Sequence, residues 1–205
     1  MDFFPRPVAR YVRQDLMLVR AIAMLLTRRR DVRDVEEPIP YSGPLVIILS
    51  VVAVTDGIAA FVLHLLLPPS VRLVALVLGI IGLVWLLGFI ASLICYPHVV
   101  SAERLRLRFS VFHDIVVPAT VVTSVHTASK EPLSQKSAER FEDELVMAVS
   151  GQANVTVRMD PTSFRSLNPK VSGSEGLARI TFFANEATQA RHLLQRQSDS
   201  STDTT

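Results

Sequence analysis

The sequence predicts an α+β membrane protein, in which a two-helix transmembrane hairpin precedes a small antiparallel β domain closed by a C-terminal helix. Two patterns support this fold class. Hydrophobic residues make up 49% of the 205 residues but concentrate between positions 45 and 95. After position 97 the apolar residues change from helical spacing to alternation, as expected where a chain leaves the membrane and forms a sheet. Domains usually contain about 100 to 200 residues, so the chain has room for one domain beside the hairpin.

Two long apolar segments, 45–67 and 71–95, make up a predicted transmembrane hairpin at 44–96. Each exceeds the length of about 20 residues that an α-helix needs to cross a bilayer. The Pro-Pro-Ser sequence at 68–70 leaves room only for a tight turn, because proline does not continue a helix interior. We therefore expect two antiparallel spans whose outer ends emerge on the same side of the membrane.

Arginine residues flank the outer ends of this hairpin. Eight Arg precede the first span and Arg104, Arg106 and Arg108 follow the second, whereas only Arg72 follows the turn. Because positively charged segments stay in the cytoplasm, both termini are predicted to be cytoplasmic. Arg far outnumbers Lys, which we interpret as the bias of a GC-rich bacterial genome. The expected location is a bacterial plasma membrane, crossed twice.

Residues 1–29 are predicted to form an amphipathic helix at the membrane interface. Apolar residues recur there at steps of three or four, with arginines between them: Val8, Val12, Leu16, Val19, Ala23 and Leu26. A helix that covers the cytoplasmic domain and a third membrane crossing are the alternatives. Residues 30–43 mix Arg, Asp and Glu and end in a proline-rich stretch, so we interpret them as a linker.

An acidic residue, Asp56, lies near the middle of the first span, where a carboxylate costs about 2.5 to 3.5 kcal/mol on insertion scales. Small or weakly polar residues flank it and recur in the second span: Ser50, Ala53, Gly57, Ala60 and His64, then Ala75, Gly79 and Gly82. Such residues let two helices approach closely. Reflection about the turn brings Asp56 level with about residue 83, near Trp85, whose indole N–H needs an acceptor at that depth.

We therefore expect a hydrogen bond between Asp56 and Trp85 that serves as a structural contact. Two alternatives stay open for this acid. One is a proton or cation relay through Asp56 and His64, and the other is contact with a membrane helix of a partner.

The segment 97–197 has the pattern of a small cytoplasmic β domain, in which Leu105, Leu107 and Phe109 alternate with arginines. Strands are expected at 104–109, 112–117, 121–127, 144–149, 154–160 and 177–184, a polar loop at 129–141, and a helix at 186–197 capped by Asn185. These elements describe a small, partly open barrel. The polar tail 198–205 is expected to be disordered.

The run YPHVVSAERLRLRFSVFHDIVVPATVVTSVH resembles the opening strands of a bacterial pleckstrin-homology-like (PH-like) domain, and ARITFFANEATQARHLL resembles its closing strand and helix. A transmembrane hairpin directly before the domain is an arrangement seen in that family. The resemblance covers about residues 97–197 and departs from the family pattern in the 129–141 loop and in DPTSFRSLNPKVSGSEG. It implies a PH-like β-barrel or sandwich capped by a C-terminal helix, and a membrane-tethered binding scaffold without catalytic residues. Lipid binding is not general among the bacterial members.

Two groups of residues are candidates for binding. Arg104, Arg106 and Arg108 share one face of a strand and form a candidate contact for anionic lipid or a partner. The alternative is a solvated face, or pairing with Glu142, Asp143 and Glu144. Phe164 and Arg165 follow an Asp-Pro turn and would be the anchors of a possible partner loop.

Several function classes are excluded or lack support in the sequence. A net charge of +2 is too balanced for a nucleic-acid binder. Nucleophile elbows, Gly-rich phosphate loops, Cys pairs and metal-binding His spacings are absent, so we expect no catalytic, cofactor-binding or metal-binding residues and no small-molecule substrate. The expected partners are the lipid bilayer and a protein or a second copy of the chain. The sequence thus predicts a membrane-anchored, non-catalytic binding or scaffold module, or alternatively a small accessory subunit of a transporter or channel that uses Asp56.

Overall fold

The computed structural model describes residues 6–130, 138–141, 143–160 and 177–202. The chain divides into two compact units, which we call the helical unit and the β domain. The helical unit consists of Met1–Arg30 and Pro44–Tyr96, and the β domain consists of Asp31–Gly43 and Pro97–Thr205.

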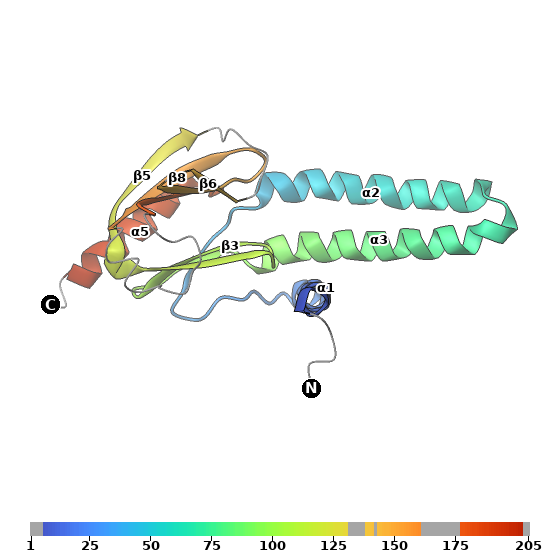
Figure 1. The fold of residues 1–205 in the computed structure, drawn as a ribbon, viewed down its shortest axis with the longest axis horizontal. Helices are drawn as coiled ribbons and strands as arrows, with labels where there is room; N and C mark the ends of the chain where they lie inside the picture. Colours follow the sequence, from blue (N-terminus) through green and yellow to red (C-terminus); the bar gives the residue numbers. More distant parts are fainter. Residues whose placement is uncertain (1–5, 131–137, 142, 161–176, 203–205) are drawn as a thin grey trace. The chain divides into compact units, whose positions relative to one another are not determined.

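The helical unit contains α1 (Arg6–Leu26), α2 (Gly43–Leu66) and α3 (Pro69–Cys95). The last two helices run antiparallel, joined by a short turn (Figure 1). Pro69 begins α3, where its fixed φ suits the first helical position and its missing N–H costs nothing. The Arg72 guanidinium donates to the Leu67 carbonyl oxygen at 3.1 Å, so the one cation near the turn satisfies a carbonyl group that follows α2.

Both α2 and α3 are long and apolar enough to cross a membrane, with mean hydropathies of 2.5 and 2.9. Their side chains are not covered by protein: Ile58, Phe61 and Leu73 are 60%, 63% and 69% exposed. In water such a continuous apolar surface would be unfavourable, whereas lipid chains cover it without penalty.

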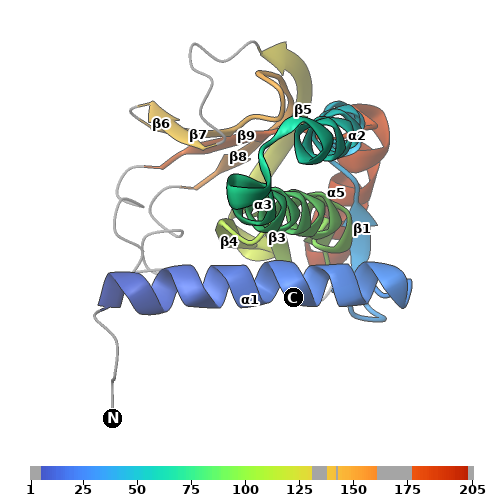
Figure 2. The same ribbon diagram turned by 90° about the vertical axis from the view of Figure 1, so that its right-hand side faces the viewer.

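The α1 helix crosses α3 at a steep angle, because Figure 1 views α1 along its axis and Figure 2 shows it lengthwise across the end of α3. Leu18 and Ala21 are buried on its inner side. A Cβ atom added at Gly88 would lie only 3.0 Å from the Cβ of Leu18. The absence of a side chain at Gly88 therefore permits this close crossing.

The described residues of the β domain form two sheets. The first has the order β1-β2-β3-β4 and is antiparallel throughout, with β1 (Glu37–Ile39), β2 (His98–Val100), β3 (Arg104–Phe109) and β4 (His113–Pro118). The second has the order β5-β8-β9-β7-β6, with β5 (Val122–Lys130), β6 (Glu139–Phe141), β7 (Glu144–Met147), β8 (Ala153–Met159) and β9 (Arg179–Phe182). Its β7–β9 pair is parallel and its other pairs are antiparallel. A 3₁₀ turn, η1 (Ala119–Val121), joins the sheets, and α5 (Ala187–Thr202) ends the described chain.

The prediction of a barrel is wrong for the described residues, because neither of the two sheets closes on itself. Pro118 ends β4 without an N–H to donate, and η1 then turns the chain into the second sheet. One core nevertheless joins the layers. It contains Leu105 and Leu107 from the first sheet, Ile180 and Phe182 from the second, and Leu194 from α5.

The segment interpreted as a linker is part of the β domain. Its strand β1 pairs with β2 in the register Glu37↔Val100 and Ile39↔His98. Ile39 and Tyr41 are 3% and 0% exposed. The prolines beside Ile39 suggested a linker, yet β1 lies at the edge of its sheet, where proline is tolerated.

The predicted strands agree with β3, β4, β5, β7, β8 and β9, while β1, β2 and β6 were not predicted. The expected 129–141 loop begins inside β5 and ends with β6. At the C-terminus α5 continues to Thr202, so the predicted tail begins as helix; the sequence there contains no Gly or Pro to end it.

Candidate functional site

The three arginines of the predicted cationic stripe each contact a carboxylate within the β domain. Arg104 lies 2.8 Å from Glu36 and Arg108 lies 2.9 Å from Asp31, both nitrogen to oxygen, while Arg106 makes a bidentate contact with Asp114. Side-chain exposure is 4% for both Glu36 and Arg108. The stripe is therefore neutralised from within the domain, which weakens it as a site for anionic headgroups.

The partners of these arginines differ from those considered in the sequence. Asp143 instead pairs with Arg179 at 3.0 Å, and Glu144 accepts a hydrogen bond from the Thr181 hydroxyl at 2.5 Å. Glu142 lies outside the described residues. Two of the true partners, Asp31 and Glu36, come from the segment interpreted as a linker, and no local signal connects them to a strand so far along the chain.

Pairing with arginine changes the pKa values of two of these carboxylates. Burial disfavours ionisation of Glu36, but the hydrogen bonds from Arg104 and from the Arg33 backbone N–H, together with the charges of both arginines, hold the pKa of Glu36 below its ordinary value. The same balance lowers the pKa of Asp114, where the hydrogen bond from Arg106 opposes partial burial. Both groups are therefore ionised at neutral pH.

Next to the arginines lies a buried cluster that sequence reasoning missed. The rings of Tyr41 and His98 stack with centroids 4.2 Å apart, and the rings of His98 and Phe182 form a T-shaped pair with centroids 5.2 Å apart. His98 Nδ1 accepts the backbone N–H of Arg108 at 3.0 Å, and the Tyr41 hydroxyl accepts that of Ser110 at 2.8 Å.

Burial controls the protonation of this cluster. It lowers the pKa of His98 to about 3 and raises the pKa of Tyr41. His98 is thus a neutral hydrogen-bonding residue shielded from solvent, which indicates a structural role in joining the two sheets. The sequence feature that could have indicated this cluster is the alternation of two large apolar residues, Ile39 and Tyr41, with prolines, which is compatible with an edge strand that has one buried face.

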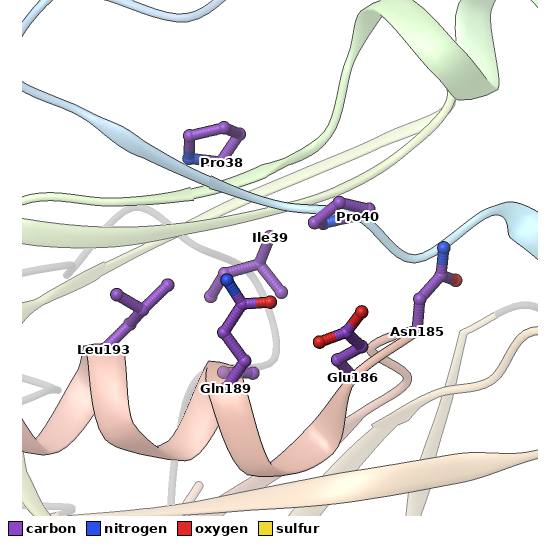
Figure 3. Close-up of a pocket in the computed structure, with 8 residues that line it drawn as sticks. Pro38, Ile39, Pro40, Asn185, Glu186, Gln189 and Leu193 are labelled. Atoms are coloured by element: carbon purple, nitrogen blue, oxygen red, sulfur yellow. The ribbon is translucent and has the colours of Figure 1, made fainter.

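A shallow groove lies between β1 and α5 on the surface of the β domain, with a volume of about 90 Å³ (Figure 3). Its lining comes from both elements: Pro38, Ile39 and Pro40 from β1 and the residue after it, and Asn185, Glu186, Gln189, Ala190 and Leu193 from the helix side. The groove is far smaller than the roughly 300 to 1,000 Å³ of small-molecule sites. Its size suits a single inserted side chain.

Asn185 closes one end of this groove in a role that differs from the predicted helix cap. It lies two residues before α5, and its side-chain oxygen accepts the Gly43 backbone N–H at 3.2 Å. The Asn185 backbone N–H in turn donates to the Pro40 carbonyl oxygen at 2.8 Å. These two bonds hold the chain after β1 against the start of α5.

In the helical unit one pair of the predicted small residues meets, Ala60 and Gly79, whereas a Cβ atom added at Gly57 or Gly82 would meet nothing within 4 Å. Ala53 is 8% exposed, and a Cβ atom added at Gly79 would lie 3.3 Å from the Cβ of Ala60. Close approach of α2 and α3 therefore depends on small side chains.

The predicted Asp56–Trp85 hydrogen bond is not formed among the residues that the structure describes. Asp56 is exposed, and Trp85 is 48% exposed with its ring 5.9 Å from that of Phe89. The reason is the position of Trp85 around the axis of α3. Trp85 follows Gly79 by six residues, which at 3.6 residues per turn places it about 120° around α3 from the face that meets α2.

His64, the third member of the predicted intramembrane group, has a buried Nδ1 atom without a hydrogen-bond partner in the described part of the chain. Phe164 and Arg165 lie outside the described residues. Within the described ranges, no group of three or more His, Cys, Asp or Glu side chains is placed to hold a metal ion.

No family model, curated protein or solved structure matches this chain. The PH-like resemblance of residues 97–197 therefore stays a prediction from the sequence.

Proposed function

We propose that this protein is a membrane-anchored, non-catalytic binding or scaffold module, with α2 and α3 as transmembrane spans and the β domain, a PH-like fold, on the cytoplasmic side. The observation that carries the proposal is the exposed apolar surface of two helices that are 24 and 27 residues long. Only a surrounding apolar phase covers such a surface on all sides.

The topology follows from the hairpin. Because α2 and α3 are antiparallel and joined by a short turn, the start of α2 and the end of α3 lie at the same end of the pair. Arginines flank that end, which favours its cytoplasmic placement in a bacterial plasma membrane.

The β1–α5 groove is the surface that best supports binding of a protein partner. Its apolar lining includes Ile39 and Leu193, and its edge carries the exposed polar side chains of Glu186 and Gln189. A buried apolar anchor with a polar rim is the usual composition of a protein contact. The internal pairing of Arg104, Arg106 and Arg108 leaves less positive charge for lipid headgroups.

The test is photo-crosslinking in native membranes of the full chain carrying a photoreactive side chain at Gln189. A matched control carries it at Arg191, an exposed residue of the same helix that does not line the groove. We expect a stoichiometric protein adduct from position 189 and none from 191. Equal labelling at both positions, or none at either, would contradict a role for the groove.

A second candidate function is an accessory subunit of a transporter or channel. The exposed carboxyl of Asp56 in mid-span and the unpartnered Nδ1 of His64 favour it. Asp56→Asn separates the two functions. Scaffold function survives this substitution, because the groove is untouched, whereas ion- or proton-coupled transport by a partner is lost.

A further inference from the structure

The α1 helix exposes an apolar side that no described residue of the helical unit covers. Leu16, Val19 and Leu26 are 65%, 58% and 80% exposed, and Ala23 is exposed beside them. In a helical projection of about 100° per residue, these four residues fall within about 80° of one another. Arg20, also exposed, lies beyond the edge of this stripe.

The contacts of α1 with α3 show which way this stripe faces. Leu18 meets α3 at Gly88, while the Ala21 carbonyl oxygen lies 3.7 Å from Cys95 Sγ and Met24 Sδ lies 3.8 Å from the Tyr96 hydroxyl. Rotation around α1 from Leu18 towards Ala21 and Met24 therefore moves towards the C-terminal end of α3. The opposite rotation, towards Val19 and Leu26, leads to the side that faces the α2–α3 turn.

The depth of the crossing is also informative. From Pro69 to Gly88, α3 rises about 28 Å at 1.5 Å per residue, close to the roughly 30 Å hydrocarbon thickness of a bilayer. From Gly88 to Cys95 it rises about 10 Å more, which corresponds to the headgroup region. A helix that crosses α3 at Gly88 thus lies at the boundary between headgroups and acyl chains, where in-plane amphipathic helices bind.

We propose that α1 lies in the plane of the cytoplasmic leaflet, with the stripe of Leu16, Val19, Ala23 and Leu26 in contact with lipid acyl chains. The inference rests on the proposed insertion of α2 and α3 and adds a third lipid-binding surface to it. The stripe turns towards the α2–α3 turn and so faces the lipid layer that the proposed insertion places around the hairpin, which is why its occupant is the bilayer. Arg20 points away from the turn side, towards headgroup phosphates and water.

One charged residue lies on the same side as the stripe. Asp15 is exposed and projects between Leu18 and Val19. A carboxylate at this boundary stays close to the headgroup region, whereas in a crossing helix it would be carried into the hydrocarbon. Its position is therefore compatible with an interfacial helix and not with a crossing helix.

The test uses nitroxide labels on the full chain in vesicles of phosphatidylethanolamine and phosphatidylglycerol. Cys95→Ala removes the one native thiol, and single labels are attached after Val19→Cys, Arg20→Cys or Phe61→Cys. All three positions are exposed, so labelling disturbs no buried contact. Electron paramagnetic resonance then compares collisions of each label with oxygen, which enters lipid, and with a water-soluble nickel complex.

We expect an oxygen-to-nickel accessibility ratio severalfold higher at Val19 than at its neighbour Arg20, and highest at Phe61. A ratio at Val19 equal to or below that at Arg20, with Phe61 still in lipid, would overturn the inference about α1 alone. Nickel accessibility at Phe61 would instead overturn the proposed insertion of the hairpin.

Discussion

The imidazole of His98 stacks on the phenol ring of Tyr41, with the two planes 17° apart and both side chains buried. This contact joins a residue of β2 to one that follows β1, on the far side of the helical hairpin in the sequence. It packs the segment before the hairpin into the core of the β domain.

Acidification should destabilise the β domain through His98. Its pKa of about 3 in the folded state lies below the ordinary value of 6.5. Below pH 6.5 the unfolded chain therefore binds a proton at His98 that the folded chain excludes. The free energy of unfolding should be highest above pH 6.5 and should decrease as the pH falls towards 3. Thermal unfolding of the full protein in detergent, followed between these limits, should show a falling midpoint.

His98→Leu should flatten this pH dependence between 6.5 and the range where carboxylates titrate. The matched control is His192→Leu, which replaces an exposed histidine of α5 and should leave the slope unchanged. Equal slopes in all three proteins would exclude His98 as the source.

The hydroxyl of Tyr41 should contribute less to the stability of the β domain than the ring of Tyr41 does. Tyr41→Phe keeps the stack on His98 but removes the oxygen that accepts the Ser110 N–H, and the loss of this hydrogen bond costs about 0.5 to 1.5 kcal/mol. Tyr41→Ala also opens a cavity and should cost about 3 to 5 kcal/mol, as for other large core side chains. Denaturant unfolding of the two variants compares them directly; equal losses would contradict the packing role of the ring.

The carboxylates that pair with the arginines of β3 should contribute to the stability of the β domain according to how deeply each is buried. Glu36→Gln should destabilise the β domain by about 1 to 2 kcal/mol, because the Arg104 guanidinium then faces a neutral and largely buried partner. Asp114→Asn is the control, since its side chain is 49% exposed and should change stability by no more than about 1 kcal/mol. A larger effect of Asp114→Asn would show that burial does not set the order.

Gly88→Leu should release α1 from α3. The new side chain would collide with Leu18, which a Cβ atom alone already approaches to 3.0 Å. Gly82→Leu is the control, because a Cβ atom at Gly82 meets nothing within 4 Å. We expect faster tryptic cleavage at Arg20 in the Gly88 variant only, and unchanged cleavage would show that the crossing does not depend on Gly88.

The β domain should fold without the helices only if β1 is retained. Asp31–Gly43 joined by a short Gly/Ser linker to a chain beginning at Pro97 should be soluble and unfold cooperatively. A chain beginning at Pro97 without this segment leaves the β2 edge and Arg108 uncovered, and should melt at a lower temperature or aggregate. Circular dichroism melts of the two proteins distinguish these outcomes.

Local patterns made much of this fold predictable, and distant contacts made the rest unpredictable. Alternation in 104–109 and 154–160 identified β3 and β8, because one face of each strand packs in the core. The strand β1 escaped detection because it is three residues long and contains proline. Its pairing is decided by residues about sixty positions further along the chain.

The candidate sites divide in the same way. The three arginines could be placed on one face from spacing alone, but the carboxylate that pairs with Arg104 is 68 residues away in sequence. The Asp56–Trp85 contact was predicted from depth in the membrane, which counts residues from the turn. Depth does not specify rotation about the helix axis, and rotation decides which side chains face each other.

Because β1 precedes the hairpin and β2 follows it, the hairpin is an insertion within the β domain. During synthesis β1 leaves the ribosome first and has no partner until both helices and β2 have been made. In the proposed topology, completion of the β domain therefore reports completion of membrane insertion. A nascent chain stalled before His98 carries an unpaired edge and an uncovered Tyr41, which is the form that chaperones and quality-control proteases recognise. The chain passes between the helical unit and the β domain three times, at 30/31, 43/44 and 96/97, so cleavage of any one connection alone leaves the β domain attached to the helical unit.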